Sequence, residues 1–133
     1  MARNMGFKVE KVDLQEVIVV APFELNYNTH GTAFGGSLSV LCTLAGWCGV
    51  AAQLMRWEME PNIVISHGEI DYLAPIKGDL RVSCRQPGAE EWAEFKAKLL
   101  ERGKAKLNLT CEAISGSDVG AKYLGTYVAI AKV

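Results

Sequence analysis

The dominant feature of the hydrophobic pattern is an uncharged run from Gly31 to Met55. Apolar residues recur within it at roughly helical spacing, at Leu38, Leu41, Ala45, Ala52 and Met55. Charge returns at Arg56 and Glu58, and Pro61 ends any helical continuation. The pattern therefore predicts one long helix from Ser37 to about Trp57, apolar nearly all round and so buried.

The length of this run also fits a membrane-spanning helix. Against that reading, the run contains five glycines and polar side chains such as Thr43 and Gln53, and it lacks aromatic and basic flanks on both sides. Enough strands are predicted elsewhere to wrap the helix. We therefore expect a core helix and no membrane association.

The rest of the pattern is typical of strands. β-branched residues or alternation of apolar and polar positions mark residues 16–23, 62–73, 80–85, 105–113 and 123–133. Residues 89–100 form either a short helix or a long irregular connection, and residues 115–120 form a hairpin turn. The order is a strand, the long helix and four strands joined by short turns, so the sheet is expected to be largely antiparallel.

These elements predict an α+β fold of one domain, residues 1–133, in which an antiparallel sheet of about five to six strands wraps the helix. The net charge of −1 gives no basic field for nucleic acid. Four cysteines without paired spacing and two distant histidines predict no metal site, and reduced thiols in a cytoplasmic protein. The N-terminal residues contain no signal-peptide pattern.

The candidate chemistry lies between Asn26 and Ser37, where amides and an imidazole precede Gly35-Gly36 and the helix start. The first N–H groups of a helix have no intrahelical partner, and with the helix dipole they suit an oxyanion of acyl transfer. Alternatively, the glycines only form a tight connection into the helix. The phosphate-binding glycine patterns and the G-x-S-x-G nucleophile motif are both absent.

The run N-x-N-x-H-G-T-x-F-G-G-S from Asn26, followed by Leu44-Ala45-Gly46-Trp47, resembles the thioesterase domain at the C-terminus of bacterial YiiD-type proteins, a branch of the hot-dog superfamily. Ile70–Pro75 with Gly78-Asp79, and Arg102–Ala105, resemble two weaker motifs of hot-dog thioesterases. The resemblance extends from Val9 to Ile130.

This resemblance implies a hot-dog fold and a homodimer or a dimer of dimers, with active sites at the subunit interface. The acyl chain would lie beside the central helix, and backbone N–H groups at the helix start, including that of Gly36, would polarise the thioester carbonyl. A carboxylate usually acts as base or nucleophile in such enzymes. Asn26 and Thr43 stand where that carboxylate is expected.

Three catalytic arrangements follow. In the first, Asn28 and Thr43 position a water that attacks like hydroxide or that His30 activates. In the second, an acid of the partner subunit, Asp71 or Glu69, supplies the base. In the third, the domain binds thioesters without efficient turnover. We rank the first ahead. Each residue also has a structural reading: Asn26 and Asn28 as turn formers, Thr43 bonded within its helix, and Asp71 as a surface charge.

The predicted substrate-binding residues are Asn26, Phe34, Gly35, Ser37, Asp71, Arg102 and Lys104. Arg102, Lys104 and Lys106 would meet the phosphates of coenzyme A or phosphopantetheine, which enter as part of the substrate rather than as a cofactor; a solvated strand face is an equal alternative. Ser37 is alternatively a helix cap or first-turn residue.

The sequence therefore predicts hydrolysis of an acyl-CoA or acyl-carrier-protein thioester. The alternatives are a non-catalytic acyl-thioester binding module and, ranked lower, a hot-dog dehydratase, since no acid accompanies His30 in the motif. Chain length, carrier and the choice between dimer and tetramer depend on packing that the sequence does not specify.

Overall fold

A computed structural model describes residues 6–26 and 35–131 of the chain. The strands are β1 (Lys8–Val12), β2 (Glu16–Ala21), β3 (Asn62–Tyr72), β4 (Leu80–Arg85), β5 (Lys104–Ser115) and β6 (Asp118–Ile130). The helices are the single-turn η1 (Phe23–Leu25), the long α2 (Gly35–Arg56) and α3 (Ala89–Arg102).

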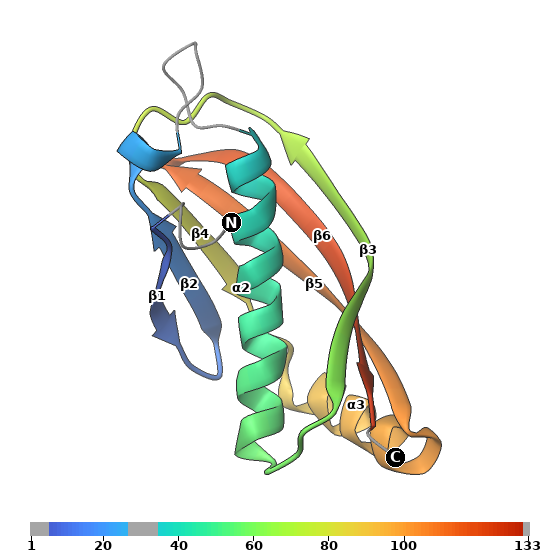
Figure 1. Ribbon diagram of the computed structural model, residues 1–133. Helices are drawn as coiled ribbons and strands as arrows, with labels where there is room; N and C mark the ends of the chain where they lie inside the picture. The colour runs from blue at the N-terminus through green and yellow to red at the C-terminus, as the bar shows by residue number, and fades with distance from the viewer. Residues whose placement is uncertain (1–5, 27–34, 132–133) are drawn as a thin grey trace.

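One six-stranded sheet runs in the order β1-β2-β4-β5-β6-β3, with every neighbouring pair antiparallel. β1 and β3 are its two edges. The sheet curves around α2, which lies along its concave side (Figure 1). This arrangement confirms the predicted α+β fold with a long central helix.

Burial of α2 explains its apolar length. Leu41 and Val50 of the helix are fully buried, as are Leu80 and Val82 of β4 in the same core. Burial of such a side chain stabilises the fold by about 1.5–3 kcal/mol. By length and composition α2 could cross a membrane, but half of its most apolar window is buried within the fold, as in a core helix.

Two helical regions sharpen the sequence reading. Residues 89–100, for which two alternatives stood open, belong to α3, which buries Trp92, Phe95 and Leu99 at helical spacing. Its C-cap is Gly103, whose left-handed backbone (φ 71°) suits glycine. The long helix begins at Gly35, two residues before the predicted start.

The strands also differ from the prediction at two points. The predicted order lacks β1, because all five of its residues are exposed and leave no apolar alternation to detect. β6 begins at Asp118 rather than Tyr123, because Ser115 pairs directly with Asp118 across a two-residue turn. The alternation predicted for residues 105–113 is confirmed by the burial of Ala105, Leu107, Leu109, Cys111 and Ala113.

Candidate functional site

The start of α2 is tied to the end of β3. The Tyr72 hydroxyl donates to the Gly35 carbonyl at 2.9 Å, and its ring lies 3.3 Å from where a Cβ on Gly35 would be. Gly36 is exposed, whereas Ser37 is buried. Because first-turn N–H groups lack partners within a helix, this anchored end can offer donors to a bound oxygen.

Asn26, the last described residue before Gly35, is built into a turn. It is 2% exposed, its side-chain amide donates to the Pro22 carbonyl at 2.7 Å, and its backbone N–H donates to the Phe23 carbonyl at 2.9 Å. These contacts agree with the turn-forming alternative. The predicted site residues Asn28, His30 and Phe34 lie outside the described residues.

Thr43 lies two turns along α2 from Gly36 and is half-buried. Its hydroxyl donates to the Ser39 carbonyl at 2.9 Å, the bond within the helix considered from the sequence. The same Oγ1 also lies 3.5 Å from the hydroxyl oxygen of Tyr123 in β6. Thr43 is therefore on the side of the helix that faces β6.

Tyr123 and Tyr127, four residues apart on the inner face of β6 with Gly125 between them, continue this polar contact. Their hydroxyl oxygens are 3.2 Å apart, and the Tyr127 hydroxyl donates to the Thr43 backbone carbonyl at 2.8 Å. Gly46 and Gly125 leave room for these hydroxyls, since a Cβ at either position would clash with one of the two tyrosine side chains. We call Thr43, Tyr123 and Tyr127 the hydroxyl cluster.

Burial keeps several nearby groups protonated. Burial, followed by the hydrogen bond with Tyr123, raises the pKa of Tyr127, so its hydroxyl remains a donor. Burial likewise raises the pKa of Cys42 to about 12, and a contact with Cys84 together with burial raises that of Cys111. Since a thiolate is the reactive form, these two cysteines are poor nucleophiles.

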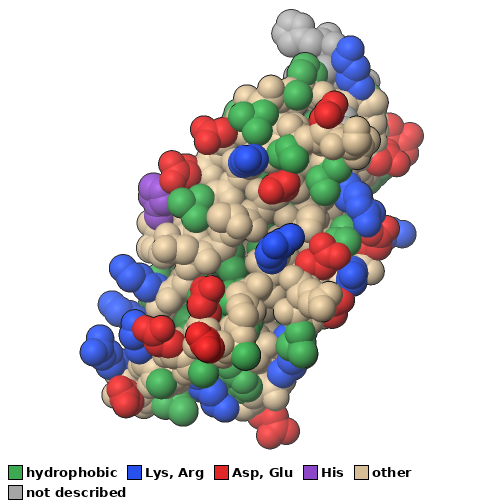
Figure 2. Space-filling model, turned by 180° about the vertical axis from the view of Figure 1, so that it is seen from behind, with side chains coloured by type: hydrophobic (Ala, Val, Ile, Leu, Met, Phe, Trp, Pro, Cys, Tyr) green, Lys and Arg blue, Asp and Glu red, His purple; other side chains and the backbone are tan. Residues whose placement is uncertain are grey.

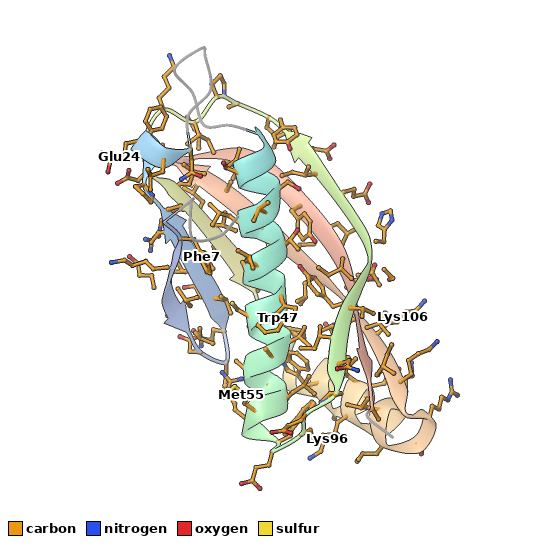
Figure 3. All side chains as sticks on the ribbon, in the orientation of Figure 1. Phe7, Glu24, Trp47, Met55, Lys96 and Lys106 are labelled. Carbon is orange, nitrogen blue, oxygen red and sulfur yellow. The ribbon has the colours of Figure 1, made fainter. Side chains whose placement is uncertain are left out.

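Large apolar side chains are exposed on both α2 and β3. On α2, Trp47 is 42% exposed and Met55 is 75% exposed (Figure 3). On β3, Ile65 pairs with Tyr127 and so shares its face toward the helix, yet it is 43% exposed. We call Trp47, Met55 and Ile65 the open apolar face. Exposed apolar patches of this kind mark interaction or ligand surfaces.

The acids near the end of β3 face the other way. Glu69 is paired with Leu124 and Asp71 with Lys122, in alternation with the buried Tyr123. Directly paired residues share a face, so both carboxylates lie on the outer side of the sheet and are exposed. Within one chain, neither is brought to the start of α2.

The predicted phosphate-binding residues are also remote from Gly35 within one chain. Arg102 ends α3 and Lys104 begins β5, where β6 joins it to the Asn62 end of β3. Gly35 is held at the Tyr72 end, ten residues and about 33 Å away along the strand. The outer face of the sheet mixes both charges, with Lys and Arg gathered along one lower edge (Figure 2).

An open pocket of about 430 Å³ lies at the opposite end of α2, between Trp57 and Trp92. The two rings meet edge to face with centroids 5.8 Å apart, and the Lys96 ammonium lies 5.2 Å from the Trp57 ring centroid. In residues 6–26 and 35–131, no cluster of His, Cys, Asp or Glu could hold a metal ion.

The tyrosines were the functional candidates that sequence reasoning missed. A usable signal was the spacing Tyr123-x-Gly125-x-Tyr127, which puts a glycine between two tyrosines on one face of a strand. Buried tyrosine hydroxyls need partners, so such a motif predicts polar groups on the packed helix.

Comparison with known proteins identifies relatives that match nearly the whole chain. A family described as "Putative thioesterase (yiiD_Cterm)" matches residues 1–131. A solved protein of unknown function from Chlorobaculum tepidum TLS is 29% identical over 98% of this chain and 86% of that one, with a TM-score of 0.93. A structure described as the "putative thioesterase from Shewanella oneidensis" is 30% identical, covering 97% and 87%, with a TM-score of 0.86.

A third similar structure comes from Pseudomonas aeruginosa and is described as a "Probable Thioesterase". It is 21% identical over 98% of this chain and 86% of that chain, with a TM-score of 0.78, and it supports the fold alone. Together with the helix and sheet arrangement, these relatives identify the fold as the hot-dog fold.

Proposed function

The chain belongs to the YiiD C-terminal thioesterase family, and from this premise we propose that it hydrolyses an acyl-CoA or acyl-carrier-protein thioester at the interface of two copies. The observation that carries the proposal is the Gly35 end of α2, anchored by Tyr72 on the helix that also carries Trp47 of the open apolar face. A helix start with available amides suits the carbonyl, and an uncharged helix face suits an acyl chain.

The β3 edge supports association of two copies. Its first five residues, 62–66, carry no charge, and Val64 and Ile65 are 45% and 43% exposed. An unpaired edge of this kind can pair with an identical strand about a two-fold axis. The same association would cover part of the open apolar face and enclose an acyl chain between the copies.

In this proposal the amides of Gly36 and Ser37 hold the thioester carbonyl oxygen while Thr43 positions a water. The water oxygen bonds to the carbonyl carbon, and the carbonyl electrons move onto the held oxygen. The carbon–sulfur bond then breaks, its electron pair leaves on sulfur, and sulfur takes up the proton that the water releases. The products are a carboxylic acid and a thiol. Asn28 and His30 remain predicted partners of that water.

A second copy would also resolve the remoteness of the basic residues. In an antiparallel β3–β3 pair, the Asn62 end of one copy lies beside the Tyr72 end of the other. Lys104 of the second copy, and Arg102 beside it, would then lie three strand spacings from Tyr72 of the first, about 14 Å away. We propose that they bind coenzyme A phosphates in trans.

The test is a panel of acyl-CoAs of increasing chain length, each followed by release of free thiol. We expect turnover well above the buffer rate for at least one chain length, and loss of that turnover when the α2 start is altered in Tyr72→Phe. A complete panel without cleavage contradicts hydrolysis.

A second candidate function is binding of acyl thioesters without turnover. The observation favouring it is that Thr43, at the position where related enzymes are expected to have a carboxylate, donates its hydroxyl proton to the Ser39 carbonyl. Calorimetry with a non-hydrolysable acyl-CoA thioether separates the two candidates. Micromolar binding with no cleavage of the matching thioester identifies a binding module.

A further inference from the structure

The hydroxyl cluster has three protons, and its geometry fixes where each one goes. A backbone carbonyl can only accept, so the Tyr127 proton lies on the 2.8 Å contact to the Thr43 carbonyl. By the same reasoning, the Thr43 hydroxyl proton lies on the 2.9 Å contact to the Ser39 carbonyl. Two of the three protons are therefore committed to the helix backbone.

The third proton follows from the first two. Because Tyr127 donates its proton to the Thr43 carbonyl, its oxygen can only accept in the 3.2 Å contact with Tyr123. Tyr123 is therefore the donor in that contact. The remaining contact, from Thr43 Oγ1 to Tyr123 Oη, is 3.5 Å long. That exceeds the usual 2.5–3.0 Å of hydroxyl hydrogen bonds, as expected when no proton is left for it.

Thr43 Oγ1 and Tyr123 Oη thus face one another with lone pairs available on both oxygens. A pair of acceptors is matched by a molecule that brings two donors. We propose that these oxygens bind one water molecule, and that Tyr123 is the positioning residue that sets its orientation. The role given to this water rests on the proposed thioesterase function.

The place of this pair in the fold suits such a role. Tyr123 is only 4% exposed, whereas Thr43 is half-buried, so the pair is reached from the open side of α2. The Tyr123 hydroxyl also lies 3.4 Å from where a Cβ on Gly68 would be, which puts it beside β3, the edge proposed to pair with a second copy.

Orientation has a direct chemical consequence. A water that donates both hydrogens to Thr43 and Tyr123 turns its own lone pairs away from them. Those lone pairs form the new bond to the thioester carbon, in the balanced step given above. The hydroxyl cluster would therefore act in place of the missing carboxylate by alignment rather than by proton abstraction.

The decisive variant is Tyr123→Phe, which keeps the ring in the core and removes one acceptor. Thr126→Val is its matched control: Thr126 is on the same strand, and its hydroxyl donates to Asn108 at 2.7 Å on the exposed outer face. We expect Tyr123→Phe to lower kcat at least about tenfold with KM within about twofold, and Thr126→Val to change neither. Thr43→Ser should keep most of the activity that Thr43→Val loses.

Crystallography of the full chain gives a readout independent of turnover. We expect an ordered water within hydrogen-bond distance of both oxygens in the wild type and none there in Tyr123→Phe. If the wild type cleaves thioesters while Tyr123→Phe has wild-type kcat, the inference fails and the proposed function stands. If no thioester is cleaved, the attacking role is overturned, and the diffraction result alone upholds or overturns the water site.

Discussion

The two edges of the sheet differ in length and in charge. β1 has five residues, three of them charged: Lys8, Glu10 and Lys11. β3 has eleven residues, and residues 62–66 carry no charge. Yet the exposed apolar residues are alike, since Val12 of β1 is 40% exposed and Ile65 of β3 is 43% exposed. Charge, rather than apolar exposure, distinguishes the edges.

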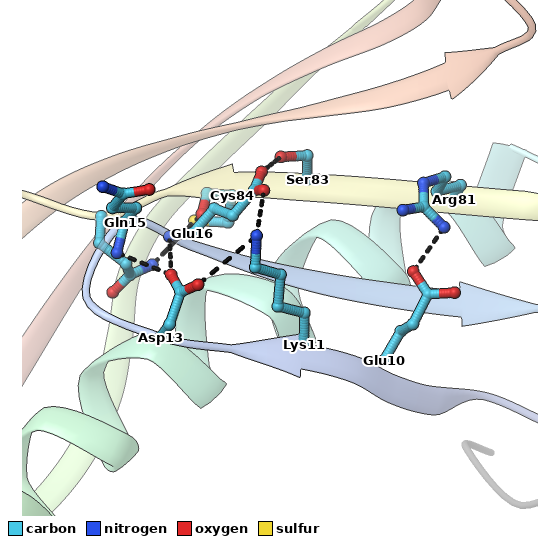
Figure 4. Close-up of polar contacts among 9 residues, drawn as sticks. Glu10, Lys11, Asp13, Gln15, Glu16, Arg81, Ser83 and Cys84 are labelled. Atoms are coloured by element: carbon cyan, nitrogen blue, oxygen red, sulfur yellow. Dashed lines mark hydrogen bonds and ion pairs between the residues drawn. The ribbon is translucent and has the colours of Figure 1, made fainter.

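Two of the three charged residues of the β1 edge, Glu10 and Lys11, are paired with neighbouring residues (Figure 4). Lys11 Nζ lies 3.0 Å from Glu16 Oε1 and 3.5 Å from Asp13 Oδ2, and Glu10 pairs with Arg81. A short charged edge disfavours pairing with another chain. The β1 edge therefore disfavours association with another chain, whereas the β3 edge is open to it, and the proposed dimer forms through β3.

The largest effect should come from a charge placed on the open edge. Ile65→Lys would bury an unpaired ammonium group in each half of a symmetric interface, which costs several kcal/mol. We expect the mass from light scattering to fall from two chains to one. Thioester hydrolysis should fall with it, because the proposed site needs both copies.

Val12→Lys on β1 is the control, because the starting exposure of the residue is nearly equal. It should keep the mass and activity of the wild type. Equal masses for the two variants would contradict the assignment of β3 as the interface.

Sequence reasoning found the elements that bury an apolar face and missed the one that does not. The alternation from Ala105 to Ala113 and the spacing in α2 both report burial, and both were predicted. β1 is held by pairing with β2 and by ion pairs, neither of which leaves a periodic apolar signal. Hydrophobic pattern reports packing, so an exposed edge strand escapes it.

The site was predictable to the same extent. Gly35 and Thr43 could be chosen because a glycine pair before a helix and a hydroxyl inside an apolar helix are visible in the sequence. The contacts that Tyr72 and Tyr123 make with these residues could not be predicted, since each tyrosine meets the helix from a strand distant in sequence. Only the packing of β3 and β6 against α2 brings them together.

A smaller effect concerns the packing of α2 against the sheet on the side of the open edge. Beside β3, α2 approaches β6 closely enough that a Cβ on Gly46 would overlap the Tyr127 hydroxyl. Gly46→Ala should therefore cost about 1–3 kcal/mol of unfolding free energy by overpacking. Gly78→Ala, with nothing within 4 Å of the new methyl group, should change it by less than about 0.5 kcal/mol. Urea denaturation compares them, and an unaffected Gly46→Ala would show that the ring moves freely.

A further step tests whether the basic residues act across the open edge. Arg102→Glu with Lys104→Glu should weaken coenzyme A binding about tenfold in calorimetry, by replacing phosphate contacts with repulsion. In the Ile65→Lys background the same pair should have little further effect, since the second copy is gone. Lys8→Glu on β1 reverses a charge at the closed edge and should leave affinity unchanged. A full tenfold loss in the monomer would place the basic residues in cis.

The smallest effect concerns acid stability of the closed edge. Backbone N–H groups of Glu16 and Gln15 lower the pKa of Asp13 from 3.8, and hydrogen bonds from Lys11 and Ser83 lower that of Glu16 from 4.5. A carboxyl group with a lowered pKa stabilises the fold at pH values above its ordinary pKa. This stabilisation is lost as the pH falls through the lowered pKa. Urea midpoints of Asp13→Asn/Glu16→Gln should therefore lie slightly below wild type at pH 7 and converge with it in acid below the lowered pKa values. The control Glu69→Gln on β3 should have the urea midpoint of the wild type at neutral and at acid pH. If the double variant stays below the wild type in acid, its loss of stability comes from packing rather than from charge.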